Sequence, residues 1–199
     1  MTEAVNINID DRELVKRCQR GDSRAMETLI VRYQNRIYNV ILKMCGNVDD
    51  AAELSQDAFV KAIENIYNFE GRSSFYTWLF RIAVNLTLNF CKRNVKLGIT
   101  SIEADNCNEQ TRTSLKEVLT NNDAPNPAAV TENREICDLI IKAIMNLDDD
   151  QRAVVVLRDI EGMNYSQIAD VLDIELGTVK SRLSRARGNL RESLEVVIK

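Results

Sequence analysis

A run of cations near the C-terminus carries the residue types best suited to binding a nucleic acid. Five basic side chains follow Gly177, with no acidic residue among them: Lys180, Arg182, Arg185, Arg187 and Arg191. Apolar residues recur between them at helical steps of four, three and four, at Val179, Leu183, Ala186 and Leu190. Lys and Arg are the side chains that neutralise phosphates. The pattern predicts a helix with one apolar side and one cationic side.

A shorter helical pattern comes before this run, and the two together fit a helix-turn-helix. The apolar residues on its face are Ile168, Ala169 and Leu172. Asn164 and Gln167 resemble a capping box, with Asn in place of the usual Ser or Thr. Ala169 lies ten residues before Val179, and a small residue there lets the two helices cross closely. Asp173 falls at the left-handed position of the turn, where it costs about 1 kcal/mol relative to Gly. We expect duplex DNA binding, although an amphipathic helix with a solvated basic face would carry the same charges.

A second candidate nucleic-acid surface lies in the first half of the chain. A short loop, FEGRSS at residues 69–74, precedes an expected helix over residues 75–93 that holds the only tryptophan, Trp78. Aromatic rings beside cations and amides suit single-stranded nucleic acid, because bases stack on the rings and amides reach base edges. On these residues alone, an aromatic core helix is the simpler interpretation.

Charge is sorted along the chain into patches of opposite sign. Residues 48–57 hold four acids and no base, whereas residues 81–96 hold four bases and no acid. Asp49 or Asp50 is expected to cap a helix, and acids near a helix start suit its dipole. The same acids could also form a docking surface for a basic partner. The net charge of −4 is therefore compatible with DNA binding, and two kinds of partner are expected.

Composition argues against an enzyme. Histidine is absent, which removes the commonest general base and a common metal ligand. No phosphate-binding loop or nucleophile elbow is found, and the five cysteines are too scattered for a disulfide framework or a zinc site. We expect no catalytic residue, metal or cofactor.

No apolar run approaches the roughly 20 residues that span a bilayer, and the N-terminus lacks a signal peptide, so a cytoplasmic location is expected.

The elements that must position these residues are all helical. Helical periodicity is expected over residues 10–19, 22–45, 50–66, 75–93, 136–147 and 154–160, and then over the helix-turn-helix. From residue 94 the periodicity fades into polar residues and the only two prolines, with a short helical piece expected over 114–119. We therefore predict an all-α chain of two small helical domains, at 1–94 and 131–199, joined by a flexible, solvated linker at 95–130.

Several stretches resemble, in order and spacing, the bacterial extracytoplasmic-function RNA polymerase sigma factors, group 4 of the sigma-70 family. The resemblance covers four motifs, one of them in two parts: GDSRAMETLIVRYQNRIYNV, DDAAELSQDAFVKAI, FEGRSSFYTWLFRIAVN and, after the linker, DQRAVVVLRDIEGMNYSQIADVL with GTVKSRLSRAR. Three positions depart from the usual pattern. Asp148 stands where Pro commonly follows Leu147, Asn89 where Asp is common, and Glu53 where the family has Asp.

The resemblance implies a role for each surface. The first domain would be sigma region 2, which docks on core polymerase and recognises and melts the −10 element, and the second would be region 4, which reads the −35 element. The polymerase-binding residues would be Asp49, Asp50, Glu53, Gln56 and Asp57. A flipped base of the −10 non-template strand would be held by Phe69, Glu70, Gly71, Arg72, Ser73, Ser74, Asn85 and Asn89. The −35 duplex would be bound by Thr178, Lys180, Ser181, Arg182, Ser184, Arg185 and Arg187, with Arg182 and Arg187 on phosphates.

The implied partners are core RNA polymerase, through the clamp and flap of its large subunits, and promoter DNA. An anti-sigma factor, often membrane-anchored in this family and linked to stress responses, is also implied, and no small-molecule substrate is expected.

Two other interpretations of the residues stay open at this point. One is a stand-alone helix-turn-helix regulator with an N-terminal effector or dimerisation domain, and the other is an all-α interaction adaptor.

Overall fold

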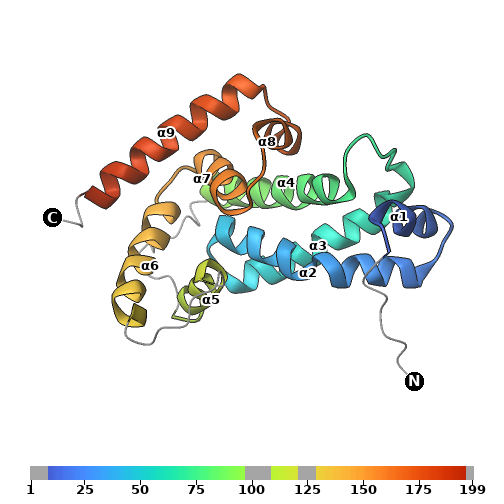
Figure 1. The fold of residues 1–199 in the computed structure, drawn as a ribbon, viewed down its shortest axis with the longest axis horizontal. Coiled ribbons are helices and arrows are strands. Elements are labelled where there is room, and N and C mark those ends of the chain that lie inside the picture. The colour runs from blue at the N-terminus through green and yellow to red at the C-terminus, as the bar shows by residue number, and fades with distance from the viewer. Residues whose placement is uncertain (1–8, 97–108, 121–128, 196–199) are drawn as a thin grey trace.

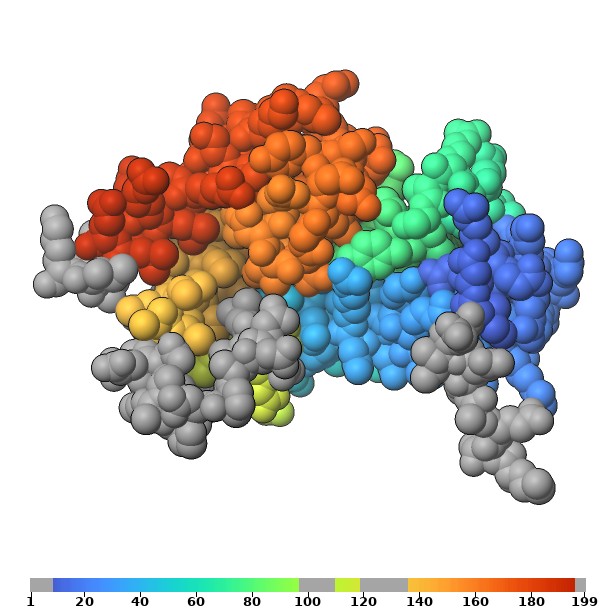
Figure 2. Space-filling view, viewed as in Figure 1, coloured from blue at the N-terminus to red at the C-terminus, as the bar shows by residue number. Residues whose placement is uncertain are grey.

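The computed structural model describes residues 9–96, 109–120 and 129–195, and the regular structure in these ranges is entirely helical (Figure 1). The prediction of an all-α chain is confirmed. Helices α1 to α4 form an N-terminal domain, and helices α6 to α9 form a C-terminal domain that lies against it (Figure 2).

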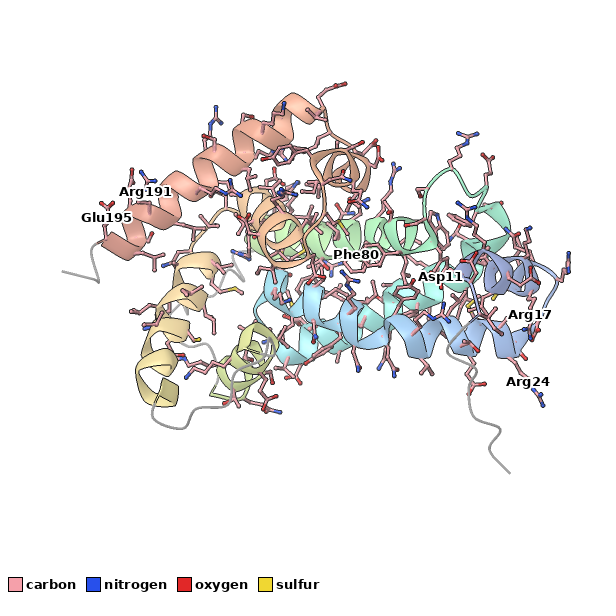
Figure 3. All side chains as sticks on the ribbon, viewed as in Figure 1. Asp11, Arg17, Arg24, Phe80, Arg191 and Glu195 are labelled. Carbon is pink, nitrogen blue, oxygen red and sulfur yellow. The ribbon has the colours of Figure 1, made fainter. Side chains whose placement is uncertain are left out.

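The N-terminal domain is built from three long helices that contact one another, with a short fourth helix beside them. Its elements are α1 (Asp11–Gln19), α2 (Ser23–Cys45), α3 (Val48–Asn65), the 3₁₀ turn η1 (Ile66–Asn68) and α4 (Phe75–Lys96). Phe80 of α4 lies near the middle of the molecule (Figure 3) and is fully buried, as are Ile37 and Ile41 of α2. Burying such side chains stabilises the fold by roughly 1.5–3 kcal/mol each. This core fixes α3 and α4, which carry two of the predicted surfaces.

Local capping signals set the ends of these helices. The sequence predicts Asp22 as the cap of α2 and Gly46 as its end, because these residue types favour those positions. Both predictions are confirmed: the Asp22 carboxylate accepts hydrogen bonds from the amides of residues 24 and 25 at 3.0 and 3.3 Å, and Gly46 ends α2 in the left-handed conformation. The expectation that Asp49 or Asp50 caps α3 is wrong. Asn47 caps it instead, because its backbone is extended and its side chain accepts from the amides of Asp49 and Asp50 at 2.9 and 3.1 Å.

Helical spacing along residues 75–93 predicts a buried stripe of Trp78, Leu79, Ile82, Leu86 and Phe90, and the buried face of α4 differs from it. Leu79 is buried as expected, but Trp78, Ile82, Leu86 and Phe90 are only half-buried. The fully buried residues are instead Phe80, Ala83, Val84 and Thr87. The reason is that α4 packs against α2 and α3 on one side and against α8 on another, which periodicity within one helix does not report.

The C-terminal domain follows a helix that lies within the expected linker. Helix α5 (Glu109–Thr120) is longer than the piece predicted there, and it buries Thr111 and Leu115 against α2, α3 and α6. Lys116 pairs with Asp138 of α6 at 2.8 Å. These contacts do not fit a solvated tether over this helix, while the boundaries at 94 and 130 stay predictions.

The C-terminal domain itself contains five helical elements. They are α6 (Ala129–Met145), α7 (Asp149–Val155), the single π turn η2 (Val156–Ile160), α8 (Tyr165–Leu172) and α9 (Leu176–Glu195). The sequence predicts Asp148 or Asp149 as the cap of this helix. Asp148 directly precedes α7, but its side chain makes no capping hydrogen bond. Within the residues that the structure describes, no helix is both long enough and apolar enough to cross a membrane.

Candidate nucleic-acid and partner interface

The helix-turn-helix is formed as the sequence predicts. The Asn164 side chain accepts from the Gln167 amide, and the Gln167 side chain accepts from the Asn164 amide, both at 2.9 Å. Asp173 has φ 55° and ψ 50°, and its amide donates to the Ala169 carbonyl, which ends α8. Val179 is fully buried, so the start of α9 is fixed against the turn.

The side chains predicted to read duplex DNA line the side of α9 away from its buried residues. Lys180, Ser181, Ser184 and Arg185 are exposed, whereas Thr178 and Arg182 are half-buried. The Ser181 hydroxyl donates to the Thr178 carbonyl at 3.0 Å, so it is partly occupied by its own helix. Neither Lys180 nor Arg185 forms an ion pair with a described residue. These two cations are therefore available to DNA in this conformation.

Two arginines assigned to phosphates are already held by carboxylates. Arg182 pairs with Asp150 of α7 at 3.0 Å. Arg187 makes two hydrogen bonds to Asp159 of η2, at 2.5 and 3.3 Å, and this carboxylate raises the pKa of the guanidinium. The acids occupy the same donors that a phosphate would use.

The loop at residues 69–74 is anchored at both ends. The Gln19 side chain donates to the Ile66 and Phe69 carbonyls, each at 2.9 Å, and the Phe69 ring lies 5.1 Å from that of Trp78, centroid to centroid. At the other end, the Ser74 hydroxyl accepts from the Thr77 amide at 3.0 Å and caps α4. This cap is not among those predicted from the sequence, although a Ser before a helical pattern is its usual signal.

The middle of the loop is open to solvent. Gly71 adopts φ +73°, which favours glycine, and nothing lies within 4 Å of the place where a Cβ would be. Glu70 pairs with Arg72 at 2.6 Å, and both side chains are exposed, so the pair adds little stability. The loop is therefore accessible to a nucleic-acid strand.

Asn85 and Asn89 lie further along α4 than this loop. They follow Ser74 by 11 and 15 residues, which places them about 16 and 22 Å further along α4 at roughly 1.5 Å per residue. The predicted −10 residues are spread along one helix and the loop before it. Arg81 lies between the loop and Asn85 along the chain, and it pairs with Asp173 at 3.5 Å, where α8 packs on α4.

The predicted polymerase-binding residues gather at the start of α3. Asp49, Glu53, Gln56 and Asp57 are exposed, and Asp50 is half-buried. Partial burial, followed by the charges of Glu53 and Asp49, raises the pKa of Asp50. Within the described part of the chain, no cation pairs with any of these acids. Their mutual repulsion is therefore not offset by a described cation.

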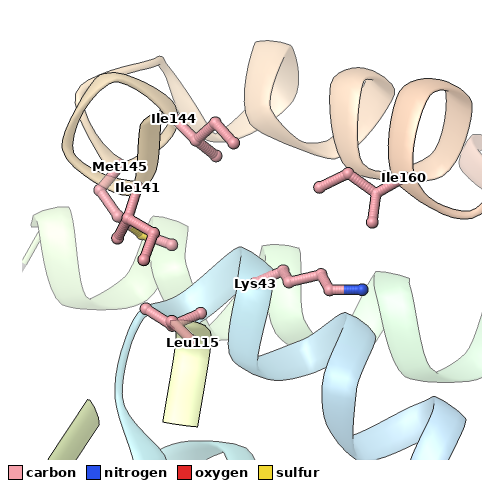
Figure 4. Close-up of a pocket in the computed structure, with 6 residues that line it drawn as sticks. All are labelled: Lys43, Leu115, Ile141, Ile144, Met145 and Ile160. Carbon is pink, nitrogen blue, oxygen red and sulfur yellow. The ribbon is translucent and has the colours of Figure 1, made fainter. Parts of the chain in front are cut away.

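A cluster between the two domains was not anticipated from the sequence. Glu161, directly after η2, accepts from Lys43 Nζ at 3.0 Å and from Arg36 Nε at 3.1 Å. The Arg36 guanidinium also lies 4.4 Å from the centre of the Tyr76 ring, and burial raises the pKa of Tyr76 to about 12. The Lys43 side chain also lines a small pocket, together with Leu115, Ile141, Ile144, Met145 and Ile160 (Figure 4). No local signal could reveal this cluster, because Glu161 lies 118 residues after Lys43.

Comparison with known families gives two matches that together cover most of the described helices. The sigma-70 region 2 family model matches residues 29–96, and the sigma-70 region 4 model matches residues 137–190. The ECF RNA polymerase sigma-E factor of Escherichia coli K12 is 33% identical over 195 residues, covering 96% of this chain and 97% of the relative. The RNA polymerase sigma-H factor of Pseudomonas aeruginosa is 34% identical over 193 residues, covering 95% of this chain and 96% of the relative.

Two solved structures share the fold. CnrH in complex with the cytosolic domain of CnrY aligns with a TM-score of 0.63 at 24% identity, covering 94% of this chain and 97% of that one. The sigma factor RpoE of Bartonella quintana, in complex with the anti-sigma factor NepR, aligns with a TM-score of 0.59 at 26% identity, covering 85% of this chain and 96% of that one.

Proposed function

The chain belongs to the extracytoplasmic-function RNA polymerase sigma factors of the sigma-70 family, and from that membership we propose that three of its surfaces divide the work of promoter recognition. As a sigma factor it directs core polymerase to promoters and takes part in initiation. The match to both sigma regions favours this function over a stand-alone helix-turn-helix regulator. The RNA itself is made by polymerase, and we propose no catalytic residue here.

The acidic start of α3 docks on a basic surface of core polymerase. Asn47 caps α3, so the acids that follow it are not needed as caps. Asp49, Glu53 and Asp57 stay exposed without a described cation beside them. This exposed, unpaired acidic surface is the observation that carries the docking proposal.

Promoter DNA is read at two places. The exposed side of α9 binds the −35 duplex, with Lys180 and Arg185 free to reach bases or phosphates. The loop at 69–74 and the face of α4 with Asn85 and Asn89 bind the unstacked −10 non-template strand. Asn and Arg suit this task because amides and guanidinium groups make bidentate hydrogen bonds to base edges.

An anti-sigma factor is a further expected partner. The RpoE structure that shares this fold holds one, and CnrH is bound to the cytosolic domain of CnrY. A membrane-anchored inhibitor is the form that the family resemblance implies. Binding to polymerase and chromosomal DNA would place the chain in the cytoplasm.

The proposal is tested by transcription in vitro. The purified chain with core polymerase, on a library of genomic promoter fragments, should produce transcripts from a defined subset that core polymerase alone does not start. A stable complex with polymerase that starts at no fragment would contradict the DNA-reading assignment. Absence of any complex would contradict the docking assignment.

The −10 assignment has its own test. Asn89→Ala should weaken selection of −10 sequences in the same library, because one base-edge contact is lost. Asn65→Ala is the matched control, since Asn65 is exposed on α3, outside the proposed site, and among the described residues its side chain bonds only to the Lys61 carbonyl of its own helix. Equal −10 selection by both variants would remove Asn89 from the site.

A further inference from the structure

A single glutamine of α1 holds the chain where it leaves α3 for the loop at residues 69–74, which we call the −10 loop. The Gln19 amide nitrogen donates to the Ile66 carbonyl and to the Phe69 carbonyl, each at 2.9 Å. These carbonyls belong to the first residue of the η1 turn and to the residue just after it, and the Phe69 amide donates to the Ile66 carbonyl at 3.2 Å. One side chain therefore bridges the whole turn.

The bridge depends on the chemistry of glutamine. A primary amide carries two N–H donors, so Gln19 can give one to each carbonyl. Glutamate has the same length, but its ionised carboxylate only accepts hydrogen bonds and would face the two carbonyls with like partial charge. Methionine also has a similar length and offers no N–H donor. The side chain at this position can therefore be changed in its hydrogen bonding while its size is kept.

Helix α1 is itself fixed, so Gln19 holds the turn from a rigid element. The helix lies beside the chain that leads from α3 to α4 (Figure 1). At its start, the Asp11 carboxylate accepts hydrogen bonds from the Arg32 guanidinium and the Tyr33 hydroxyl of α2. The residues that α1 buries are Leu14, Val15 and Cys18.

The Phe69 ring is packed beside the root of the −10 loop. Its centroid lies 5.1 Å from that of Trp78 and 6.1 Å from that of Phe75, and the residue is half-buried. A base stacks on an aromatic ring through its open face, whereas the Phe69 ring is already packed against two others. Phe69 therefore anchors the loop, and the exposed residues 70–73 are left to contact DNA.

The exposed tip of the loop has little of its own to hold it in place. Glu70 and Arg72 form an ion pair, but both side chains are exposed and such pairs contribute little. The Ser73 hydroxyl donates to the neighbouring Ser74 carbonyl at 3.3 Å, which is a local contact. The order of the tip must therefore come from the ends of the loop, and Gln19 holds the first of these ends.

We propose that Gln19 is a positioning residue for the −10 loop, which it orders before the non-template strand arrives. Unstacking a base already opposes its capture, and a loop that had to be ordered at the same moment would oppose it further. The effect on DNA rests on the proposed function, because the loop is taken to bind the −10 strand. The order that Gln19 gives to the loop does not rest on it.

The first test follows the order of the loop in the free, full-length chain. Trypsin cuts after Lys and Arg, and Arg72 lies in the exposed tip. Gln19→Met should raise the rate of cleavage after Arg72 by roughly 5- to 30-fold, the range for losing one or two hydrogen bonds that restrain local opening. Mass spectrometry measures this rate, with cleavage after Arg36 in the middle of α2 as the reference for wider unfolding. Gln34→Met makes the same change on the exposed surface of α2 and should be cut as the wild type is.

The second test measures strand capture by the complex of the chain with core polymerase. The probes are a fluorescent non-template oligonucleotide with a −10 sequence selected in the promoter library, and the same strand with each −10 base in turn replaced by an abasic site. Wild type and Gln34→Met should prefer the intact strand. Gln19→Met should lose most of this preference while binding core polymerase and the −35 duplex as the wild type does. Gln19→Glu should lose at least as much.

Circular dichroism shows whether each variant is folded, and Gln19→Ala takes the place of Gln19→Met if that variant is not. Cleavage after Arg72 at the wild-type rate would overturn the ordering of the loop by Gln19. Faster cleavage with a wild-type strand preference would overturn its role in capture, and so would an equal loss of polymerase binding. A wild-type complex without any preference for the intact strand would instead contradict the −10 assignment of the loop itself, and with it the effect of Gln19 on DNA.

Discussion

The acids at the start of α3 and the acids of the C-terminal domain carry the same charge in different surroundings. Asp49 and Glu53 are exposed and have no described cation beside them, whereas Asp150, Asp159 and Glu161 each pair with Lys or Arg. An acid that folding has already neutralised offers little to a partner, while an unpaired cluster gains when a basic surface approaches. The two regions therefore show how a chain with net charge −4 can bind both polymerase and DNA.

Reversing the unpaired acids gives the largest expected effect. Glu53→Lys with Asp57→Lys should weaken binding to core polymerase by at least about 100-fold, because facing like charges across an interface costs several kcal/mol. The dissociation constant is measured by fluorescence anisotropy. Glu13→Lys with Glu192→Lys makes the same change in net charge on exposed parts of α1 and α9. Equal weakening by both pairs would show that net charge, rather than the α3 surface, controls docking.

The cations of α9 differ in the same way, because Arg185 has no described acidic partner whereas Arg187 pairs with Asp159. Arg185→Ala should reduce discrimination between −35 sequences by about 1–3 kcal/mol, or roughly 5- to 150-fold, because a free guanidinium can make a bidentate base contact. Arg187→Ala should leave this discrimination unchanged, because Asp159 already holds its guanidinium. Competition binding on a library of upstream sequences distinguishes them. If Arg185→Ala reads every upstream sequence as the wild type does, the recognition face is misplaced.

Replacing the paired acid Asp150 should change DNA binding, whereas replacing the unpaired acid Asp49 should not. Asp150→Asn keeps the side-chain shape but releases Lys92 and Arg182, so DNA binding at low salt should tighten. Stability should change by less than about 1 kcal/mol, because the Asp150 side chain is 34% exposed and such pairs contribute little. Asp49→Asn is the control, and it should leave DNA binding of the free chain unchanged. Denaturant unfolding and a salt series of DNA affinities check both variants.

The smallest expected effects are in the titration of individual acids. The hydrogen bond from Arg17 lowers the pKa of Asp22 below its ordinary 3.8, whereas burial, followed by the charges of Glu53 and Asp49, raises that of Asp50. Asp22 therefore stabilises the fold above pH 3.8, and this contribution is lost as the pH falls through its folded pKa. Asp50 contributes in the opposite sense, since its favourable term is present below pH 3.8 and lost as the pH rises through its raised pKa. Carboxyl chemical shifts followed by NMR should move on opposite sides of 3.8, and shifts on the same side would contradict the paired and unpaired assignment.

Features encoded within a few residues could be predicted from the sequence. The Asp22 cap, the end of α2 at Gly46 and the Asn164–Gln167 capping box each depend on neighbours in the chain, and each is confirmed. The left-handed Asp173 also follows from its position in the turn. The Asn47 cap was missed because the acids just after it also suit a helix start, although Asn is an equally good capping residue.

Features that depend on distant residues could not be predicted in this way. The buried face of α4 is set by α8 as well as by its own domain, and the contacts of Arg152 and Glu161 reach residues more than 100 positions away. The sequence shows that Arg182 and Arg187 are basic, but only the fold shows that Asp150 and Asp159 hold them. The residues predicted to bind DNA and polymerase stay predictions, now with a geometry in which to test them.

The π turn η2 makes the chain tolerant of a change in its own length at one place. In this turn the Glu161 amide bonds to the Val156 carbonyl five residues earlier, at 2.9 Å, so the segment holds one residue more than a regular α-helix would. A deletion of one residue within 156–160 would restore the regular helix and leave the segment after it in nearly the same orientation, whereas the same deletion in a regular helix would rotate that segment by about 100°. Glu161 would then keep its place beside Lys43. Related chains that are one residue shorter here should therefore bring their domains together in the same way.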